Sequence, residues 1–407
     1  MAFAYIWAAF ILVAVAMACW QLAVGGDHEV FGALVQSTFD MASTSVEIAI
    51  YLVGVIVLWQ GIMAVGERGG AVGHLTRIVS PFFVKLFPDV PKNHPALGAI
   101  LMNFSANMLG LDNAATPLGI KAMEELQEIN KDKQTASNAM IMFIVLNTSG
   151  LTIVPVSVMA LRAANGAANP SDVFMPILLT TYFATLAGLV AVAVKQRINL
   201  FQPVIVTTIG AFTAAIIALL IWFRSLPPDE VQSISSAMGN GIILLLISWF
   251  VGTALFKKVN VYEAFIEGAK SGFNTAVGII PYLVAILVAI GMFRASGAMD
   301  VLLSSISSLL GLSPEVANAL PTALMKPLSG SGARGMMVEA MVTHGADSFT
   351  GRLASVFQGS TETTFYTIAV YFGAVQIKRI RYTLWAGLFA DLCGIVAAII
   401  IASVFFG

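Results

Sequence analysis

The stretch that decides the fold is Lys326-Pro-Leu-Ser-Gly-Ser-Gly-Ala-Arg-Gly335, followed by Phe357-Gln-Gly-Ser-Thr-Glu-Thr-Thr364. Both runs are polar and contain glycine, yet they lie in segments that are otherwise apolar enough for a bilayer. Hydrocarbon offers no water to backbone amides, so irregular backbone survives there only when it is buried in protein or lines a wet cavity. The two runs therefore predict helices that are interrupted at membrane depth. The simpler alternative is a pair of glycine hinges near the membrane surface, whose charges reach water.

Composition places the chain in the membrane. Of its 407 residues, 58% are hydrophobic and 11% are charged, whereas soluble domains carry about 25% charged residues. The formal net charge is −1 and no basic cluster dominates, so we expect the lipid bilayer, and no nucleic acid, as a partner. The two cysteines and four histidines follow no metal-ligand spacing, so we expect no metal site and no cofactor beyond a coupling ion.

Apolar runs of about 20 residues predict membrane spans. Five of them are Phe3–Val24, Val46–Val65, Val173–Val194, Val204–Phe223 and Met238–Leu255. Between the first two, Glu29–Met41 is shorter and mixed in polarity, which is typical of an interfacial helix. Glu67–Pro95 interleaves basic residues with aromatics and leucines, and it indicates a structure that lies on the surface.

Two further runs of the first half contain breaks. Ala96–Met123 is long enough to cross, but Gly110–Pro117 interrupts it, and Asp112 or Asn113 can cap a second half-helix there. Thr135–Ala163 is interrupted by Leu146-Asn-Thr-Ser-Gly150 and by Pro155. The first half therefore repeats the pattern that opened this section.

Local matches in a common order indicate an internal duplication. Tyr282-Leu-Val matches Tyr51-Leu-Val, Leu328–Ala333 takes the place of Gly110–Ala115, and Phe357–Ser360 overlies Leu146–Ser149. We therefore predict an all-α polytopic membrane protein with two duplicated repeats, each holding two discontinuous transmembrane helices. The predicted domains are 1–44 (a transmembrane and an interfacial helix), 45–195 (first repeat), 196–260 (connecting helices) and 261–407 (second repeat).

The relative direction of the two repeats stays open at this point. Six predicted crossings separate equivalent helices, which would make the repeats parallel, whereas a single re-entrant stretch among the six would invert them. The positive-inside rule does not decide, because alternate loops carry nearly equal numbers of Lys and Arg.

The interrupted segments resemble the Gate, or nucleoside-recognition, family. Leu111–Gly119 and Leu146–Gly150 resemble the signature of spore maturation protein A, while Lys326–Ala333 and Gly359–Tyr366 resemble that of spore maturation protein B. The resemblance covers roughly residues 40–405 and implies a fusion of A-type and B-type parts that transports a small solute. Gate domains also occur in ferrous-iron transporter B, but no G domain and no cysteine in a break is present here, which argues against iron.

Broken helices in corresponding positions of two halves are a sequence pointer to a transporter's binding site. We expect neutral side chains at the breaks to bind a polar solute: Asn113, Asn147, Ser149, Ser329, Ser331, Gln358, Ser360 and Thr361. Arg334 is a candidate anchor for a carboxylate or phosphate, or else an internal ion pair with Glu339 or Glu362. Asn130, on the polar connector, is expected to be neutral for binding.

Coupling to Na⁺ or H⁺ is assigned to Glu362, because a carboxylate at membrane depth titrates or coordinates rather than staying bare. Asp112 is a second candidate, with a plain helix cap as its alternative. The function predicted is secondary transport of a nucleoside-like or amino-acid-like solute across a bacterial inner membrane.

Two other readings remain. The chain could be a structural or ligand-sensing membrane protein in envelope or spore maturation, while an enzyme is disfavoured because no catalytic motif is present. The sequence leaves homo-oligomer formation open.

Overall fold

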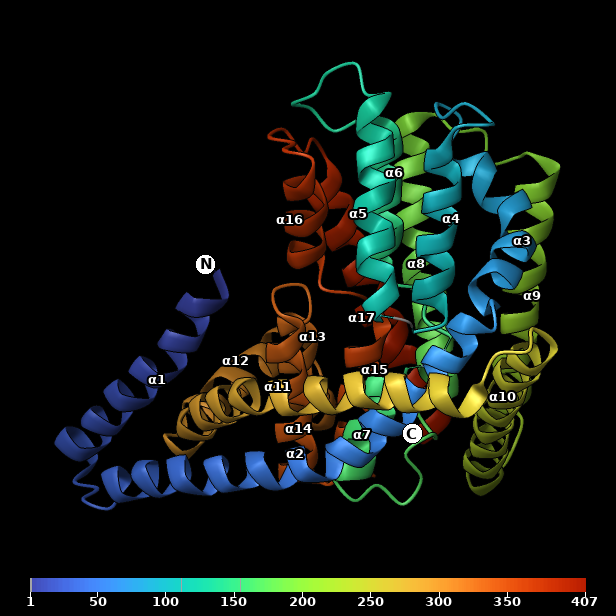
Figure 1. Cartoon of the computed structure of the whole chain (residues 1–407). Helices are drawn as coiled ribbons and strands as arrows, with labels where there is room; N and C mark the ends of the chain where they lie inside the picture. Colours follow the sequence, from blue (N-terminus) through green and yellow to red (C-terminus); the bar gives the residue numbers. More distant parts are fainter. Residues whose placement is uncertain (1, 111, 154) are drawn as a thin grey trace. The chain divides into compact units, whose positions relative to one another are not determined.

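The computed structural model describes residues 2–110, 112–153 and 155–407 (Figure 1). Their backbone is helical, and the β structure among them is an isolated bridge between Thr135 and Arg379. Seven of the described helices are long and apolar enough to cross a membrane, and they include all five spans predicted above. The prediction of an all-α polytopic membrane protein is confirmed.

The helices follow one order twice. Helix α1 (Ala2–Trp20), with a π-helical turn (Gln21–Gly25), precedes the first series. That series is α2 (Val30–Arg68), α3 (Ala71–Phe83) with a 3₁₀ turn (Val84–Leu86), α4 (Pro95–Met108), α5 (Asp112–Glu128), α6 (Asn138–Ser149), α7 (Val156–Ala164) and α8 (Phe174–Gln196). The connecting helices are α9 (Pro203–Arg224) and α10 (Pro228–Phe256). The second series is α11 (Val261–Ala295), α12 (Ala298–Leu310), α13 (Pro314–Met325), α14 (Gly330–His344), α15 (Phe349–Ser360), α16 (Thr364–Ala374) and α17 (Thr383–Phe406).

Helices α2–α8 and α11–α17 therefore form the two repeats. In both, a long helix is followed by a helix of 13 residues that starts after a glycine in the left-handed region, Gly70 (φ 80°) or Gly297 (φ 73°). The next helix of both begins with a proline, Pro95 or Pro314, which suits the first helical position. Each repeat then interrupts its chain twice, as the sequence predicts.

Two expectations about the first repeat are corrected. The predicted interfacial helix Glu29–Met41 is the first part of α2, which continues unbroken for 39 residues because no proline interrupts it. At about 1.5 Å per residue, α2 is about 58 Å long, well beyond a hydrocarbon core of about 30 Å. The predicted surface segment Glu67–Pro95 is also wrong in part, because α3 packs along α4 and the side chains of Phe83, Leu86 and Phe87 are buried in the same core.

The first interruption of each repeat is a hairpin. Helices α4 and α5 pack side by side, and so do α13 and α14 (Figure 1). Gly110 (φ 72°) turns the chain after α4, and the Ser329 hydroxyl accepts a hydrogen bond from the Gly332 amide (3.0 Å) to cap α14. The segment Ala96–Met123 is therefore not a crossing, since it enters and leaves on one side.

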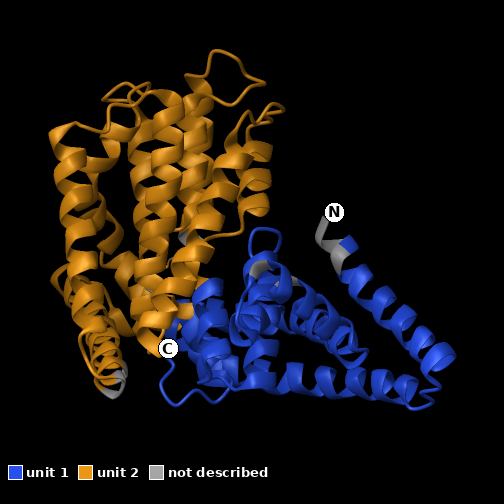
Figure 2. Cartoon of the chain, turned by 180° about the vertical axis from the view of Figure 1, so that it is seen from behind, with its two compact units in different colours: residues 1–61, 157–170, 268–358 blue, residues 62–156, 171–267, 359–407 orange. Residues whose placement is uncertain are grey.

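The described chain divides into two compact units (Figure 2). Unit 1 comprises residues 1–61, 157–170 and 268–358, and unit 2 comprises residues 62–156, 171–267 and 359–407. These units do not follow the predicted domain boundaries, because each contains parts of both repeats. The predicted boundary at 44/45 lies inside α2, whereas the one at 260/261 coincides with the start of α11.

Asn138 ties four chain segments together at one end of unit 2. Its main-chain oxygen accepts a hydrogen bond from the Gln196 carboxamide (2.8 Å), and its Oδ1 accepts one from the Arg381 guanidinium (3.0 Å). Its Nδ2 donates to Asp89 (3.4 Å). Helix α8 therefore ends, and α17 begins, at the same end of unit 2. These two packed helices are equivalent in the two repeats and run in opposite directions, so the repeats are inverted.

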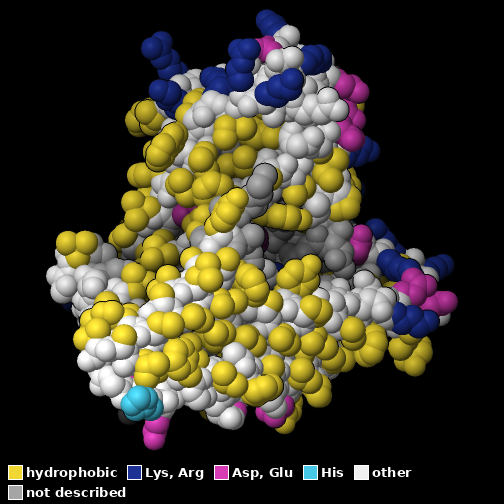
Figure 3. All heavy atoms as spheres, turned by 90° about the vertical axis from the view of Figure 1, so that its left-hand side faces the viewer, with side chains coloured by type: hydrophobic (Ala, Val, Ile, Leu, Met, Phe, Trp, Pro, Cys, Tyr) yellow, Lys and Arg dark blue, Asp and Glu magenta, His cyan; other side chains and the backbone are white. Residues whose placement is uncertain are grey.

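This end of unit 2, called the loop end below, is basic. Figure 3 shows Lys and Arg side chains gathered over it. The exposed ones on the loops and adjoining helix ends are Lys85, Lys92, Lys131, Lys133, Lys195, Arg197, Lys378, Arg379 and Arg381. The body of unit 2 below them carries an apolar core that runs through α3, α4, α5, α6, α8 and α16.

Candidate functional site

In unit 2, the ends of two interrupted helices cross. Helix α6 ends at Ser149, and the segment 361–363 leads into α16. The Glu362 amide donates to the Thr148 carbonyl (2.8 Å), and the Ile153 amide donates to the Met108 carbonyl at the hairpin tip (2.8 Å). These bonds satisfy backbone groups that the interrupted helices leave open. The crossing joins α6 and the α4–α5 hairpin of the first repeat to α16 of the second.

Gly150 permits this close approach. It lies in the left-handed region (φ 54°), and a methyl group in place of its hydrogen would lie 2.9 Å from Glu362 Cγ and 3.1 Å from the Glu362 nitrogen. The carboxylate of Glu362 is exposed, whereas the sequence analysis expected a group buried at membrane depth. The backbone of Glu362 belongs to the crossing, but its side chain points out of it.

A chain of amides leads from the hairpin to the crossing. Asn107 Nδ2 donates to Asn147 Oδ1 (2.7 Å), and Asn147 Nδ2 donates to the Phe143 carbonyl one turn earlier (2.8 Å). Asn103 Nδ2 donates to the Ala115 carbonyl of α5 (2.8 Å). The sequence analysis missed Asn103 and Asn107, although their i, i+4 spacing places both on one face of α4. Asn147 therefore holds the crossing in place through bonds that a solute would have to share or replace.

Helix α17 packs on the crossing through Gly387 and Gly394. A methyl group on Gly387 would lie 2.8 Å from Thr364 Cγ2, and one on Gly394 would lie 3.1 Å from Thr361 Cγ2. Between them on the same face, Asp391 is 3% exposed and accepts a hydrogen bond from the Thr364 hydroxyl (2.7 Å). The sequence analysis missed Asp391. The signal was a single acidic residue in the apolar run Thr383–Phe406.

The predicted site residues fall into both units. Unit 2 brings together Asn147, Ser149, Ser360, Thr361 and Glu362, and all of these except Glu362 are buried. Unit 1 holds Ser329, Ser331, Arg334 and Gln358. Asp112 and Asn113 lie in the first turn of α5, but their side chains are outside what the structure describes.

In unit 1, an ion pair occupies Glu339, one of the two partners considered for Arg334. Glu339 of α14 pairs with Arg294 of α11 (Nη2 to Oε2, 3.1 Å) and accepts from the Thr343 hydroxyl (2.9 Å). Glu339 is therefore taken by Arg294, a partner that the sequence analysis did not name. Arg334 is half-buried, and no ion pair involving it occurs among the described residues.

Two further features of unit 1 are relevant to ligand binding. A cavity of about 200 Å³ lies beside the ion pair and is lined by Ser37, Thr44, Arg294, Glu339 and Thr343 together with apolar side chains. Gln358 is 4% exposed, and its Oε1 accepts no hydrogen bond from any described residue. A buried carboxamide oxygen without a donor is costly, and such a group calls for a ligand or water.

Comparison with known proteins identifies the family. A family model described as "Gate: Nucleoside recognition" matches residues 49–165 and 276–378, which together make up more than half of the chain. The chain belongs to the Gate family. All four helix interruptions lie inside the two matched Gate segments.

Two relatives of this Gate protein come from Bacillus subtilis (strain 168). Spore maturation protein B is 48% identical over 179 residues, which are 43% of this chain and 99% of the relative. Spore maturation protein A is 41% identical over 155 residues, which are 38% of this chain and 79% of the relative. The predicted resemblance to a fusion of A-type and B-type Gate proteins is confirmed.

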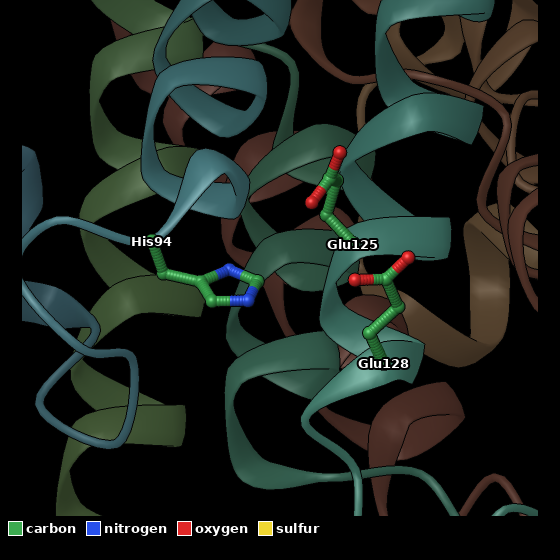
Figure 4. Close-up of side chains that lie close together, drawn as sticks. All are labelled: His94, Glu125 and Glu128. Atoms are coloured by element: carbon green, nitrogen blue, oxygen red, sulfur yellow. The ribbon is translucent and has the colours of Figure 1, made fainter.

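The first Gate repeat also contains a group with metal-ligand chemistry, which the sequence analysis did not foresee. Figure 4 shows His94 at the start of α4 facing Glu125 and Glu128 on α5, and ligand atoms of the three lie within 4.8 Å of one another. His94 Nδ1 already accepts from the Ala96 amide (3.2 Å), which caps α4. The neutral ring therefore carries its proton on Nε2, and a hydrogen bond from Nε2 to a carboxylate is the arrangement that keeps this cap. A divalent cation on Nε2 would require the other tautomer and would cost the cap.

Asn130 plays a structural role in the first Gate repeat. It is buried, and its Nδ2 donates to the Asp132 and Thr135 carbonyls (2.8 and 3.0 Å) and to Gln127 Oε1 (2.9 Å). Beside it, the Thr135 hydroxyl and the Gln134 amide hold the pKa of Asp132 below its ordinary value. Asn130 was expected to be neutral for binding, but a substitution there would disturb the loop, so a different control is needed.

Proposed function

We propose that this Gate protein is a secondary transporter of a small polar organic solute, driven by a coupling ion, in the cytoplasmic membrane of a bacterium. The observation that carries the proposal is the crossing in unit 2, to which both inverted repeats contribute an interrupted helix. The crossing is polar, although the same unit contains long apolar helices that could span a membrane. Inverted repeats with discontinuous helices are the architecture of many secondary transporters, whose solutes bind where the helices break.

The broken ends supply the binding groups. The last turn of α6 presents carbonyls that carry partial negative charge, and the start of α16 presents amides that carry partial positive charge. A zwitterionic or strongly polar solute can satisfy both kinds of end. This complementarity supports a nucleoside-like or amino-acid-like solute better than an apolar one.

Side chains at the breaks add directional bonds. We propose that Asn147, Ser149, Ser360 and Thr361 of unit 2, with Asn113 on α5, contact the solute at the crossing. In unit 1, considered by itself, the proposed binding residues are Ser329, Ser331, Arg334 and Gln358. The physical argument for ligand binding is strongest for Gln358, because its buried Oε1 accepts no hydrogen bond from any described residue. By contrast, a hollow of about 620 Å³ in unit 2 is lined by apolar side chains of α8, α9 and α17 and by Cys393 of α17, a lining that suits an acyl chain.

A non-transport role is the second candidate, because the two relatives are named for spore maturation. In that case the crossing would sense a ligand or hold the fold together, without moving a solute.

The family description supports nucleosides as the first solute class to examine.

The test is solute counterflow in proteoliposomes that contain the purified full chain, with nucleosides, amino acids and dicarboxylates as probes. We expect saturable exchange of one class. Exchange of none, by protein whose thermal unfolding is cooperative, would contradict transport and favour the second candidate.

Two variants then locate the solute. Asn147→Ala and Gln358→Ala should each weaken binding by about 5- to 150-fold, the equivalent of roughly 1–3 kcal/mol for a lost buried hydrogen bond. The control is Asn93→Ala, which removes a carboxamide from an exposed loop position and should leave binding unchanged. Equal, small effects of all three substitutions would place the site elsewhere.

A further inference from the structure

We propose that the cavity of about 200 Å³ in unit 1 binds a small aliphatic α-amino acid as a zwitterion, a molecule of the size of valine. The cavity lies between α2, α11 and α14, and its lining residues lie outside the four helix interruptions. Binding at this cavity does not depend on the proposed transport function. It gives the ion pair between Arg294 and Glu339 a task beyond joining α11 to α14.

The ion pair that lines the cavity has hydrogen-bonding capacity to spare. Arg294 turns Nε and Nη2 toward Glu339, and no described residue accepts a hydrogen bond from its Nη1. Glu339 Oε1 accepts from the Thr343 hydroxyl (2.9 Å), and among the described residues Oε2 accepts one hydrogen bond, from Arg294 Nη2 (3.1 Å). A guanidinium has five N–H donors, and a carboxylate oxygen accepts about two hydrogen bonds. A ligand can therefore bind to both members of the pair without breaking it.

Charge decides between the classes of ligand. Glu339 is 6% exposed, and Arg294 balances its charge. A simple amine or a simple carboxylate would leave one charge unbalanced in this buried place, which is costly. A zwitterion adds no net charge, because its carboxylate pairs with Arg294 while its ammonium group pairs with Glu339. A neutral nucleoside has no charge to offer to either side chain.

Two hydroxyl groups of α2 add directional bonds. Ser37 and Thr44 both line the cavity and are seven residues apart, about two turns, so they share one face of α2. Neither hydroxyl has a hydrogen-bond partner among the described residues. Close packing of α11 brings Ser37 here, because a methyl group on Gly291 would lie 2.9 Å from Ser37 Oγ. A few polar groups converging on a mostly apolar hollow are typical of a small-molecule site.

The remaining lining selects a small aliphatic side chain. The other residues of the cavity are apolar or lack a side chain: Met41, Leu287, Gly291, Ala295 and Val342. Cavities of about 150 Å³ admit benzene, so a cavity of about 200 Å³ admits a slightly larger molecule such as valine. Ala295, Val342 and Thr343 are exposed, which leaves a rim through which the ligand can enter.

Isothermal titration calorimetry of the purified full chain with L-valine tests the site. Two analogues serve as probes: isobutylamine is valine without its carboxylate, and isovalerate is valine without its amino group. We expect saturable binding of valine and at least about 10-fold weaker binding of each analogue, because each loses hydrogen bonds to a charged group. No binding of valine, or equal binding of all three compounds, would overturn the proposal and leave the ion pair with a structural task.

A matched pair of variants then locates the ligand. Thr44→Leu fills the cavity with an apolar side chain and leaves the ion pair untouched, so it should abolish valine binding. The control is Ser43→Leu, because Ser43 is the exposed neighbour of Thr44 on α2 and does not line the cavity. Thermal unfolding checks that both variants are folded.

A double variant tests the charges themselves. Arg294→Gln with Glu339→Gln removes both charges together, which avoids leaving one of them buried alone, and it should also lose valine binding. Wild-type affinity in Thr44→Leu or in the double variant, or lost affinity in Ser43→Leu, would overturn the proposal. Valine binding by a protein without solute counterflow would contradict transport and support this site, so the two proposals fail separately.

Discussion

At the scale of single residues, Gly150 sets how closely the two interrupted helices approach. We expect Gly150→Ala to destabilise the protein by at least about 1–2 kcal/mol, because a residue with a β-carbon is strained in the left-handed region and its methyl would also press on Glu362. Thermal unfolding in detergent measures the effect. Gly98→Ala is the matched control, since Gly98 lies inside α4 with open space around it, and there alanine should be neutral or slightly stabilising. Equal unfolding temperatures for the two variants would show that the approach at Gly150 is not tight.

At the scale of elements, the loop between α5 and α6 depends on Asn130. Its Nδ2 bonds two loop carbonyls, and the Gln134 carbonyl of the same loop accepts from the Lys378 and Arg379 amides (both 2.9 Å) ahead of α17. Asn130→Ala should therefore lower stability by about 1–3 kcal/mol, because two part-buried loop carbonyls lose their donor. Limited proteolysis should cut the variant faster within 129–137. Wild-type stability and protease resistance would contradict this role.

The same loop should respond to acid. The pKa of Asp132 is lowered in the folded protein, first by the Thr135 hydroxyl and then by the Gln134 amide. A lowered folded pKa means that the contribution of Asp132 to stability is present above its unfolded pKa and is lost as the pH falls through its folded pKa. We therefore expect the α5–α6 loop to be better ordered at neutral pH than at acidic pH.

At the scale of the whole molecule, the charges of unit 2 predict its orientation. Nine exposed Lys and Arg side chains lie at the loop end, and basic loops stay in the cytoplasm. Helix α9 starts at this end and extends over 22 residues, about 33 Å, to Ser225. In a background without Cys19 and Cys393, a membrane-impermeant maleimide applied to whole cells should label Ser225→Cys and not Asn93→Cys. Labelling of Asn93→Cys from outside would reverse the orientation.

Much of this architecture is predictable from local sequence. The apolar runs indicated five spans, and the polar, glycine-containing runs around Gly110, Gly150, Ser329 and Thr361 indicated all four interruptions. Both signals are local, because hydropathy depends on the side chains of one segment and a break depends on the residues that cannot continue a helix. The repeat order was readable for the same reason, since equivalent elements keep their turn residues.

What only the tertiary structure decided depends on contacts between distant segments. The chain reverses at Gly110 because α5 packs back along α4, and this hairpin removes one of the six predicted crossings, so the repeats are inverted. Glu339 pairs with Arg294, 45 residues away in sequence, rather than with nearby Arg334. Asp391 lies beside the crossing because two glycines let α17 approach Thr361 and Thr364. Such choices of partner are made by packing, which brings together side chains whose separation along the chain carries no local signal.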